Sequence, residues 1–129
     1  ILSLDRGSGL QTHINGDGYN SSRMHCGSGP VRFDAATKMN MRLEYFQGPP
    51  THIALVMMWR PWNGSASDPM CGKQGGDVGG DSNNYFWDTT KVPSQATANY
   101  QALLNRGWRP LESSNFVLPE GYTNPCTQQ

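Results

Sequence analysis

The stretch from Met39 to Trp62 constrains the fold most, because two different apolar patterns flank a tight break in it. Over 39–45 every second residue is apolar, which at the two-residue period of a strand predicts one buried and one exposed face. Over 53–59 every residue is apolar, which is typical of a short strand covered on both faces. The Gly-Pro-Pro sequence at 48–50 separates the runs, so we predict that they pair as a hairpin at the centre of a β core.

The composition agrees with a β protein. Fifteen glycines and nine prolines in 129 residues disfavour long helices and favour many loops. Ten basic residues balance ten acidic ones and are scattered along the chain, so it lacks the cationic stripe of a nucleic-acid-binding protein. The apolar run at 53–59 is too short for a membrane span. We therefore expect neither a nucleic-acid partner nor a membrane span.

Shorter strands are expected on both sides of the hairpin. Residues 2–5 and 10–14 alternate in polarity and are separated by a glycine-rich turn. Val31 to Phe33 predicts another short strand, followed by a turn at 34–38. Near the end of the chain, residues 115–119 predict a short edge strand that its proline terminates.

A single helix is expected in the second half of the chain. Pro93 and Ser94 begin it, and Gly107 supplies the residue after its C-cap. One face of the helix is apolar and would pack on the rest of the protein, through Ala96, Tyr100, Leu103 and Leu104.

The amino-acid sequence from Leu43 to Arg60 resembles the closing hairpin of PA14 domains, and its Gln-Gly-Pro turn resembles the fibro-slime type of that family. The resemblance implies a mainly β fold, an antiparallel β-sandwich or barrel, with one short C-terminal α-helix. It further implies that residues 1–62 form the back half of a PA14-like β core. Residues 63–129 would be a disulfide-stapled tail, with a loop, the short helix and an edge strand, that packs on this core.

The same resemblance implies a ligand site near Asp5. In calcium-dependent PA14 domains two adjacent aspartates grip the ion, but here only Asp5 is kept and Arg6 replaces the second aspartate. An Arg beside a carboxylate pairs with it and repels calcium, so the sequence argues against calcium at this position. If the protein binds glycans, we expect the contacts to come from loops that carry Asp5, Asn15, Asp17, Asn20 and Trp62.

Three cysteines leave one without an intrachain partner when the others pair. Cys71 and Cys126 each follow a proline-containing turn, and the Asn-Pro-Cys ending resembles fibro-slime proteins. The resemblance therefore implies a Cys71–Cys126 disulfide, with Cys26 free or paired to another chain.

Two functional classes follow from these expectations. The chain lacks a Gly-x-Ser-x-Gly elbow, a phosphate-binding loop and a His-Glu-x-x-His motif, so we expect a protein that is not an enzyme. The first class is a secreted or cell-surface module for adhesion or carbohydrate binding, which is what the family resemblance implies. The second is a structural subunit of an extracellular filament, sheath or matrix, completed by strand pairing with another chain or another copy.

Overall fold

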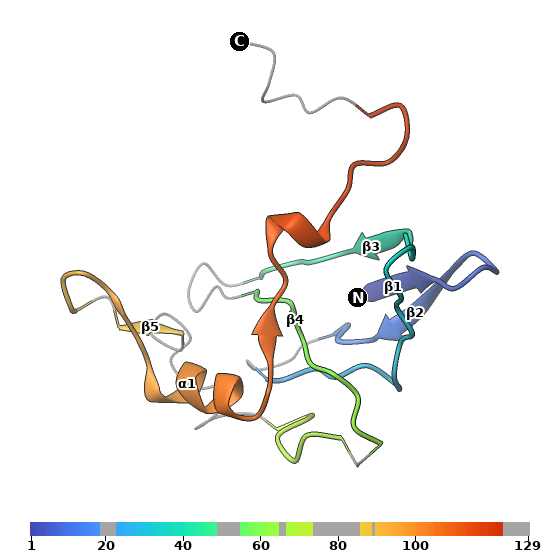
Figure 1. Cartoon of the computed structure of the whole chain (residues 1–129). Coiled ribbons are helices and arrows are strands. Elements are labelled where there is room, and N and C mark those ends of the chain that lie inside the picture. Colours follow the sequence, from blue (N-terminus) through green and yellow to red (C-terminus); the bar gives the residue numbers. More distant parts are fainter. Residues whose placement is uncertain (19–22, 49–54, 65–66, 74–85, 89, 123–129) are drawn as a thin grey trace, which may run out of the picture.

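A computed structural model describes residues 1–18, 23–48, 55–64, 67–73, 86–88 and 90–122 (Figure 1). This part contains three small antiparallel sheets, one α-helix and one short 3-10 helix. The prediction of a mainly β chain with one short helix is confirmed. Within the described residues no sheet closes on itself. The elements in chain order are β1 (Leu2–Asp5), β2 (Leu10–Ile14), β3 (Met41–Leu43), β4 (Met58–Trp59), β5 (Trp87–Asp88), β6 (Gln95–Ala96), α1 (Ala98–Asn105), β7 (Arg109–Pro110) and η2 (Ser113–Asn115).

The largest sheet has β1 in its centre, with β2 and β3 on either side. Both predicted strands of the first hairpin are present, and they pair antiparallel with Asp5 opposite Leu10 and Leu2 opposite Ile14. The register shifts between Leu2 and Ser3, so His13 is an extra residue on β2. Such a bulge bends a strand and turns its side chains away from the regular alternation.

The turn between β1 and β2 is held by the side chain of Asp5. Its Oδ1 accepts hydrogen bonds from the backbone N–H groups of Gly7 and Gly9, at 2.8 and 3.0 Å. Both glycines have positive φ, 104° and 87°, which residues with a β-carbon rarely adopt. The Asp-x-Gly-x-Gly sequence therefore explains why the chain reverses at this point.

The predicted central hairpin is wrong in its pairing. β3 pairs with β1, whereas β4 pairs with β7 in another sheet. The pairing of β1 with β3 extends beyond the ends of β3. Ile1 bonds to Glu44, and the N–H of Asp5 bonds to the carbonyl of Asn40. The strand predicted over 53–59 is reduced to two residues, and its neighbours Leu55 and Val56 are exposed, so it is not covered on both faces. Residues 49–54 lie outside the described part.

The helix begins later than the sequence pattern indicated. Thr97 is its N-cap, with its side chain accepting from the N–H of Tyr100, because the two residues before it form β6 and pair with β5. At the other end Gly107 has a φ of 91°, and the N–H of Trp108 reaches the carbonyl of Leu103. This is a Schellman motif, so the predicted role of Gly107 is confirmed.

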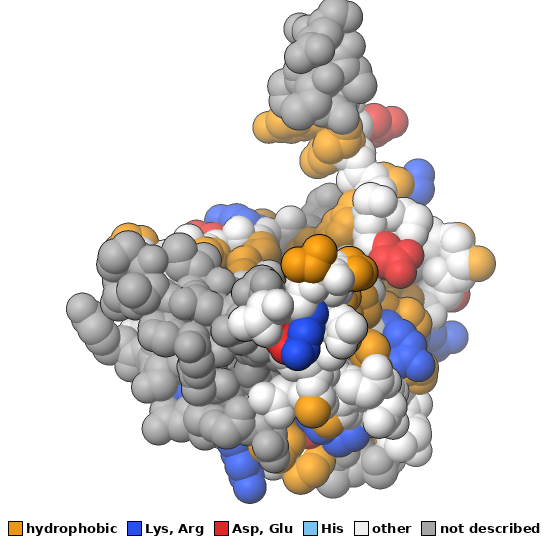
Figure 2. Space-filling model, turned by 90° about the vertical axis from the view of Figure 1, so that its left-hand side faces the viewer, with side chains coloured by type: hydrophobic (Ala, Val, Ile, Leu, Met, Phe, Trp, Pro, Cys, Tyr) orange, Lys and Arg blue, Asp and Glu red, His pale blue; other side chains and the backbone are white. Residues whose placement is uncertain are grey.

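Two further predicted strands do not form in the described part. Val31 to Phe33 has no strand pairing, although the turn that follows it is present. In place of the edge strand at 115–119, η2 ends at Asn115 and an unpaired extended segment follows. Figures 1 and 2 show this segment leaving the body of the molecule.

Few apolar side chains of the described part are buried. Leu4 of β1 is 7% exposed and Leu103 of α1 is 5% exposed, and these are its only buried hydrophobic residues. Phe86 and Trp87 pack on Tyr100 of α1, and their ring centroids lie 5.7 and 5.4 Å, respectively, from the centroid of the Tyr100 ring. Many other large apolar side chains face solvent, and several gather on the face shown in Figure 2. The apolar surface that the sequence pattern assigned to a core is therefore largely uncovered.

Candidate functional site

The polar residues expected to bind a ligand are not all brought together. Asp5 lies at the turn end of the β1–β2 hairpin, whereas Asn15 and Asp17 follow Ile14 at its open end. Because a strand rises about 3.3 Å per residue, the two groups lie ~15 Å apart. One monosaccharide or one ion cannot contact both groups. Trp62 is exposed and follows β4 in a different sheet, and Asn20 lies outside the described residues.

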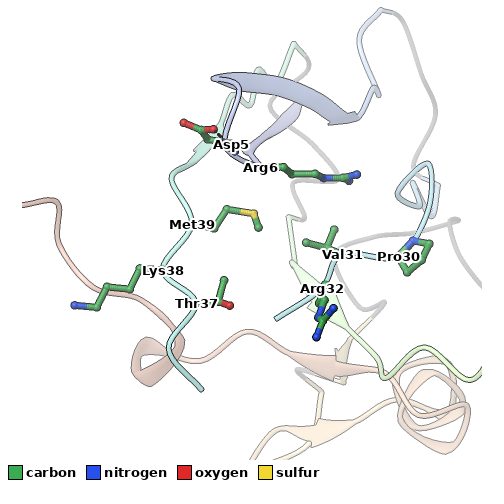
Figure 3. A pocket seen from close by; sticks show the side chains of 9 residues that line it. Asp5, Arg6, Pro30, Val31, Arg32, Thr37, Lys38 and Met39 are labelled. Atoms are coloured by element: carbon green, nitrogen blue, oxygen red, sulfur yellow. Dashed lines mark hydrogen bonds between the residues drawn. The ribbon is translucent and has the colours of Figure 1, made fainter. Parts of the chain in front are cut away.

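Asp5 also lines an open cleft of about 500 Å³ between the β1–β2 turn and two segments around residues 30–32 and 37–39. Figure 3 shows Met39 and Val31 facing each other across it, while the Lys38 side chain extends away. Oδ1 of Asp5 accepts from the two turn amides, and Arg6 donates to Nδ1 of His13 at 2.7 Å. The expected pairing of Arg6 with Asp5 is therefore replaced by an Arg6–His13 contact. Among the described residues Asp5 is the only carboxylate that lines the cleft, so these residues offer no pair of acids there.

Nothing in the described part forms a ready metal centre. No group of three or more His, Cys, Asp or Glu side chains among these residues is placed to hold an ion. His13 and His25 instead pack against glycines: a β-carbon added at Gly27 would lie 2.1 Å from Nε2 of His13, and one added at Gly16 would lie 3.0 Å from the His25 ring. Burial, and then the charge of Arg6, lowers the pKa of His13 below its ordinary value of 6.5. The ring thus lies between Arg6 and Gly27 on the bulge of β2.

Asp68 is the most buried charged residue of the described part, and its side chain has no exposed surface. Its Oδ2 accepts from Nε of Arg106 at 2.8 Å and from Nε1 of Trp108 at 2.9 Å. Oδ1 accepts from the N–H of Met70, and Arg60 lies 3.7 Å away with its guanidinium 5.0 Å from the Trp108 ring. The aspartate thus ties together the segment after β4, the end of α1 and the start of β7.

The charge of Asp68 is well compensated. Burial alone raises the pKa of this carboxyl, but the hydrogen bonds from Trp108, Arg106 and the Met70 N–H, together with the charge of Arg106, outweigh it, so the net effect is a lowered pKa. The sequence pattern did not predict this role of Asp68. Its partners lie 38 and 40 residues further along the chain, and no local pattern links them.

The disulfide prediction is wrong. Cys71 is bonded to Cys26, at a sequence separation of 45, and not to Cys126. Two backbone hydrogen bonds join the same segments, from Met24 N–H to the Lys73 carbonyl and from Gly72 N–H to the Met24 carbonyl. The turn expected to staple the tail instead packs against the loop after β2. Cys126 lies outside the described residues.

The outer side of β3 is an open sheet edge. The carbonyl of Asn40 accepts from Asp5 at 2.9 Å, and Glu44 exchanges bonds of 2.9 and 2.8 Å with Ile1, so these residues face β1. Alternation along an antiparallel ladder turns the N–H and C=O groups of Met41 and Leu43 to the outer side. No described residue bonds to them there. An edge of this kind is a template for another strand.

The side chains on one face of this edge are apolar, whereas the exposed Arg42 and Glu44, which form an ion pair, lie on the other face. Met41 and Leu43 lie opposite Leu4 and Leu2 of β1, and so share one face of the sheet with them, as the alternation predicted for this strand. Leu4 is covered, but Met41 and Leu43 are 37% and 39% exposed. The sheet therefore presents an apolar strip that ends at an unpaired edge.

Comparison of the chain with protein-family models, with curated proteins and with solved structures found no match. In the described residues no helix has the length and apolar character needed to cross a bilayer.

Proposed function

We propose that this protein is a non-enzymatic structural subunit of an extracellular filament, sheath or matrix, assembled by strand pairing with another chain. The observation that carries the proposal is the β3 edge, where unpaired backbone groups and exposed Met41 and Leu43 stand together. Natural proteins cover or charge such edges, and here the charged pair Arg42–Glu44 occupies only one face. The other face is apolar and stands beside unpaired backbone groups among the described residues, so it is suited to a partner strand. The disulfide between Cys26 and Cys71 is compatible with an oxidising, extracellular location.

The family resemblance fits this proposal. On this proposal the chain is a fibro-slime-type PA14 module, and a strand from the partner extends its sheet. Residues 1–62 then act as the back half of the core, with 63–129 packed on it. Contacts already join the two parts, since β4 pairs with β7 and Asp68 lies beside Arg60.

Carbohydrate binding for adhesion is the second candidate. It is favoured by the exposed indoles of Trp59 and Trp62, because aromatic faces next to polar groups are suited to stacking on sugar rings. Asp5 is already used in its turn, so this candidate does not depend on calcium at that residue.

Light scattering after size-exclusion chromatography, over a series of concentrations, tests the first candidate. We expect the 129-residue chain to form species larger than a monomer, with the large fraction rising with concentration. A chain that stays monomeric at every concentration would rule out self-assembly. A glycan array, read with and without a chelator, tests the second candidate. Loss of a signal in the Trp62→Ala variant would place the sugar at that indole. A signal abolished by the chelator would show that binding depends on calcium.

A further inference from the structure

The extended segment that follows η2 matches the open edge of β3. Phe116 has φ −114° and ψ 144°, which is strand geometry, and both Phe116 and Leu118 are exposed, by 44% and 57%. The backbone groups of Val117 and Leu118 have no hydrogen-bond partner among the described residues. The sequence pattern predicted an edge strand here, yet no sheet of the described residues includes this segment.

We propose that residues 116–118 of one copy add as a strand to β3 of a second copy, so that the subunits join head to tail. This inference rests on the proposed function and names the acceptor edge and the donor segment. Figures 1 and 2 show the donor leaving the body, where another copy can reach it. Because donor and acceptor are different surfaces of the same chain, repetition gives an open polymer or a ring.

The hydrogen-bonding pattern selects an antiparallel register. Leu118 lies opposite Met41 and exchanges two backbone bonds with it. Phe116 lies opposite Leu43 and accepts one bond, because its own N–H already donates to the Ser113 carbonyl at 3.1 Å. Directly opposed residues share a face, so Phe116 and Leu118 cover the exposed side chains of Leu43 and Met41.

This register also accounts for the proline that ends the segment. Residues 117 and 119 alternate with the bonded ones and turn their backbone groups away from β3. Pro119 has no N–H, but in this position none is needed, and proline is tolerated on the outer side of an edge strand. Pro119 therefore leaves one N–H fewer on the outer edge of the added strand and removes no hydrogen bond to β3.

The other edge of the sheet is a poorer acceptor. β2 carries the His13 bulge, and the His13 carbonyl already accepts from the N–H of Ser28 at 3.1 Å. Bulges bend an edge away from a flat partner strand. The outer side of β3 has neither feature in the described part of the chain.

Paired proline variants test the donor. Leu118→Pro removes the N–H that bonds Met41, and we expect it to weaken self-association about tenfold or more. Val117→Pro removes an N–H that faces outward, and the extended Phe116 before it is compatible with a following proline, so it should change the association constant by less than about threefold. Equal weakening by both variants, or none by either, would overturn the register while leaving self-assembly standing. A wild-type chain that never associates would overturn both proposals.

Cysteine cross-linking tests the contact itself, with Cys126→Ser in every chain to prevent mispairing. A Leu43→Cys chain mixed with a Phe116→Cys chain should form a disulfide-linked heterodimer under mild oxidation, since opposed Cα atoms about 5.5 Å apart suit a disulfide. An Arg42→Cys chain is the matched control, because that side chain lies on the other face of β3 and should not cross-link. Equal yields from the two mixtures would contradict the proposal. A disulfide-linked monomer from a chain that carries both Leu43→Cys and Phe116→Cys would show that the segment folds back on its own copy.

Discussion

Removal of the Asp68 carboxylate should strongly destabilise the packing of α1 against the segments around Arg60 and Trp108. In the Asp68→Ala variant, Arg106, Trp108 and the N–H of Met70 lose their acceptor, and Arg60 loses its counterion. A hydrogen bond to a charged group contributes about 1.5 kcal/mol, so three of them give ~4.5 kcal/mol. Breaking a buried ion pair by removing one partner costs about the same, ~3–5 kcal/mol.

Urea unfolding followed by tryptophan fluorescence measures this loss. With an m-value of about 1.5 kcal/mol per molar, a loss of ~4.5 kcal/mol lowers the midpoint by ~3 M. Asp34→Ala is the matched control, because Asp34 is exposed and bonds only within its own turn, to Ala36 and Thr37. It should cost about 1 kcal/mol or less. If Asp68→Ala does not fold, Trp108→Phe removes one bond and should lower the midpoint by ~1 M. Equal shifts for the Asp68 and Asp34 variants would refute the role of the buried cluster.

Three other predictions follow from the packing around the sheet. Gly27→Ala places a methyl group against the His13 ring and should cost about 1–2 kcal/mol in urea unfolding, whereas Gly29→Ala, with open space around it, should be neutral; a neutral Gly27→Ala would contradict the close approach. Burial and neighbouring cations lower the pKa values of His13 and His25, so the unfolded chain takes up protons first and stability should fall as pH drops below about 6.5; urea midpoints at pH 7.5 and 5.5 that coincide would speak against this. Peptide mapping should recover a cross-linked Cys26–Cys71 peptide and not a Cys71–Cys126 peptide, and replacing both Cys26 and Cys71 by Ser should cost about 4 kcal/mol for the loop that the disulfide closes.

Local signals in the sequence predicted the local elements well. The alternation at 2–5 and 10–14 gave both strands of the first hairpin, and Gly107 marked the end of α1. Each of these depends on neighbours within a few residues, where strand period, turn glycines and helix caps act directly.

Long-range pairing could not be predicted in the same way. The run at 39–45 was identified as a strand, but its partner proved to be β1, which lies nearly forty residues earlier in the chain. The alternation fixes which side chains share a face and not which strand lies beside it. The Cys26–Cys71 disulfide and the contacts of Asp68 could not be predicted for the same reason. Spacing alone cannot choose which of three cysteines pair, and it cannot pair an aspartate with a distant tryptophan.

Hydrogen exchange at single amides tests strand addition most directly. The N–H groups of Met41, Leu43 and Leu118 should exchange fast at concentrations where the chain is monomeric and become protected in the assembled form, while the N–H of Val117 stays fast in both. Protection of Val117 together with fast exchange at Met41 and Leu43 in the assembled form would contradict the account, because the β3 edge would then remain unpaired.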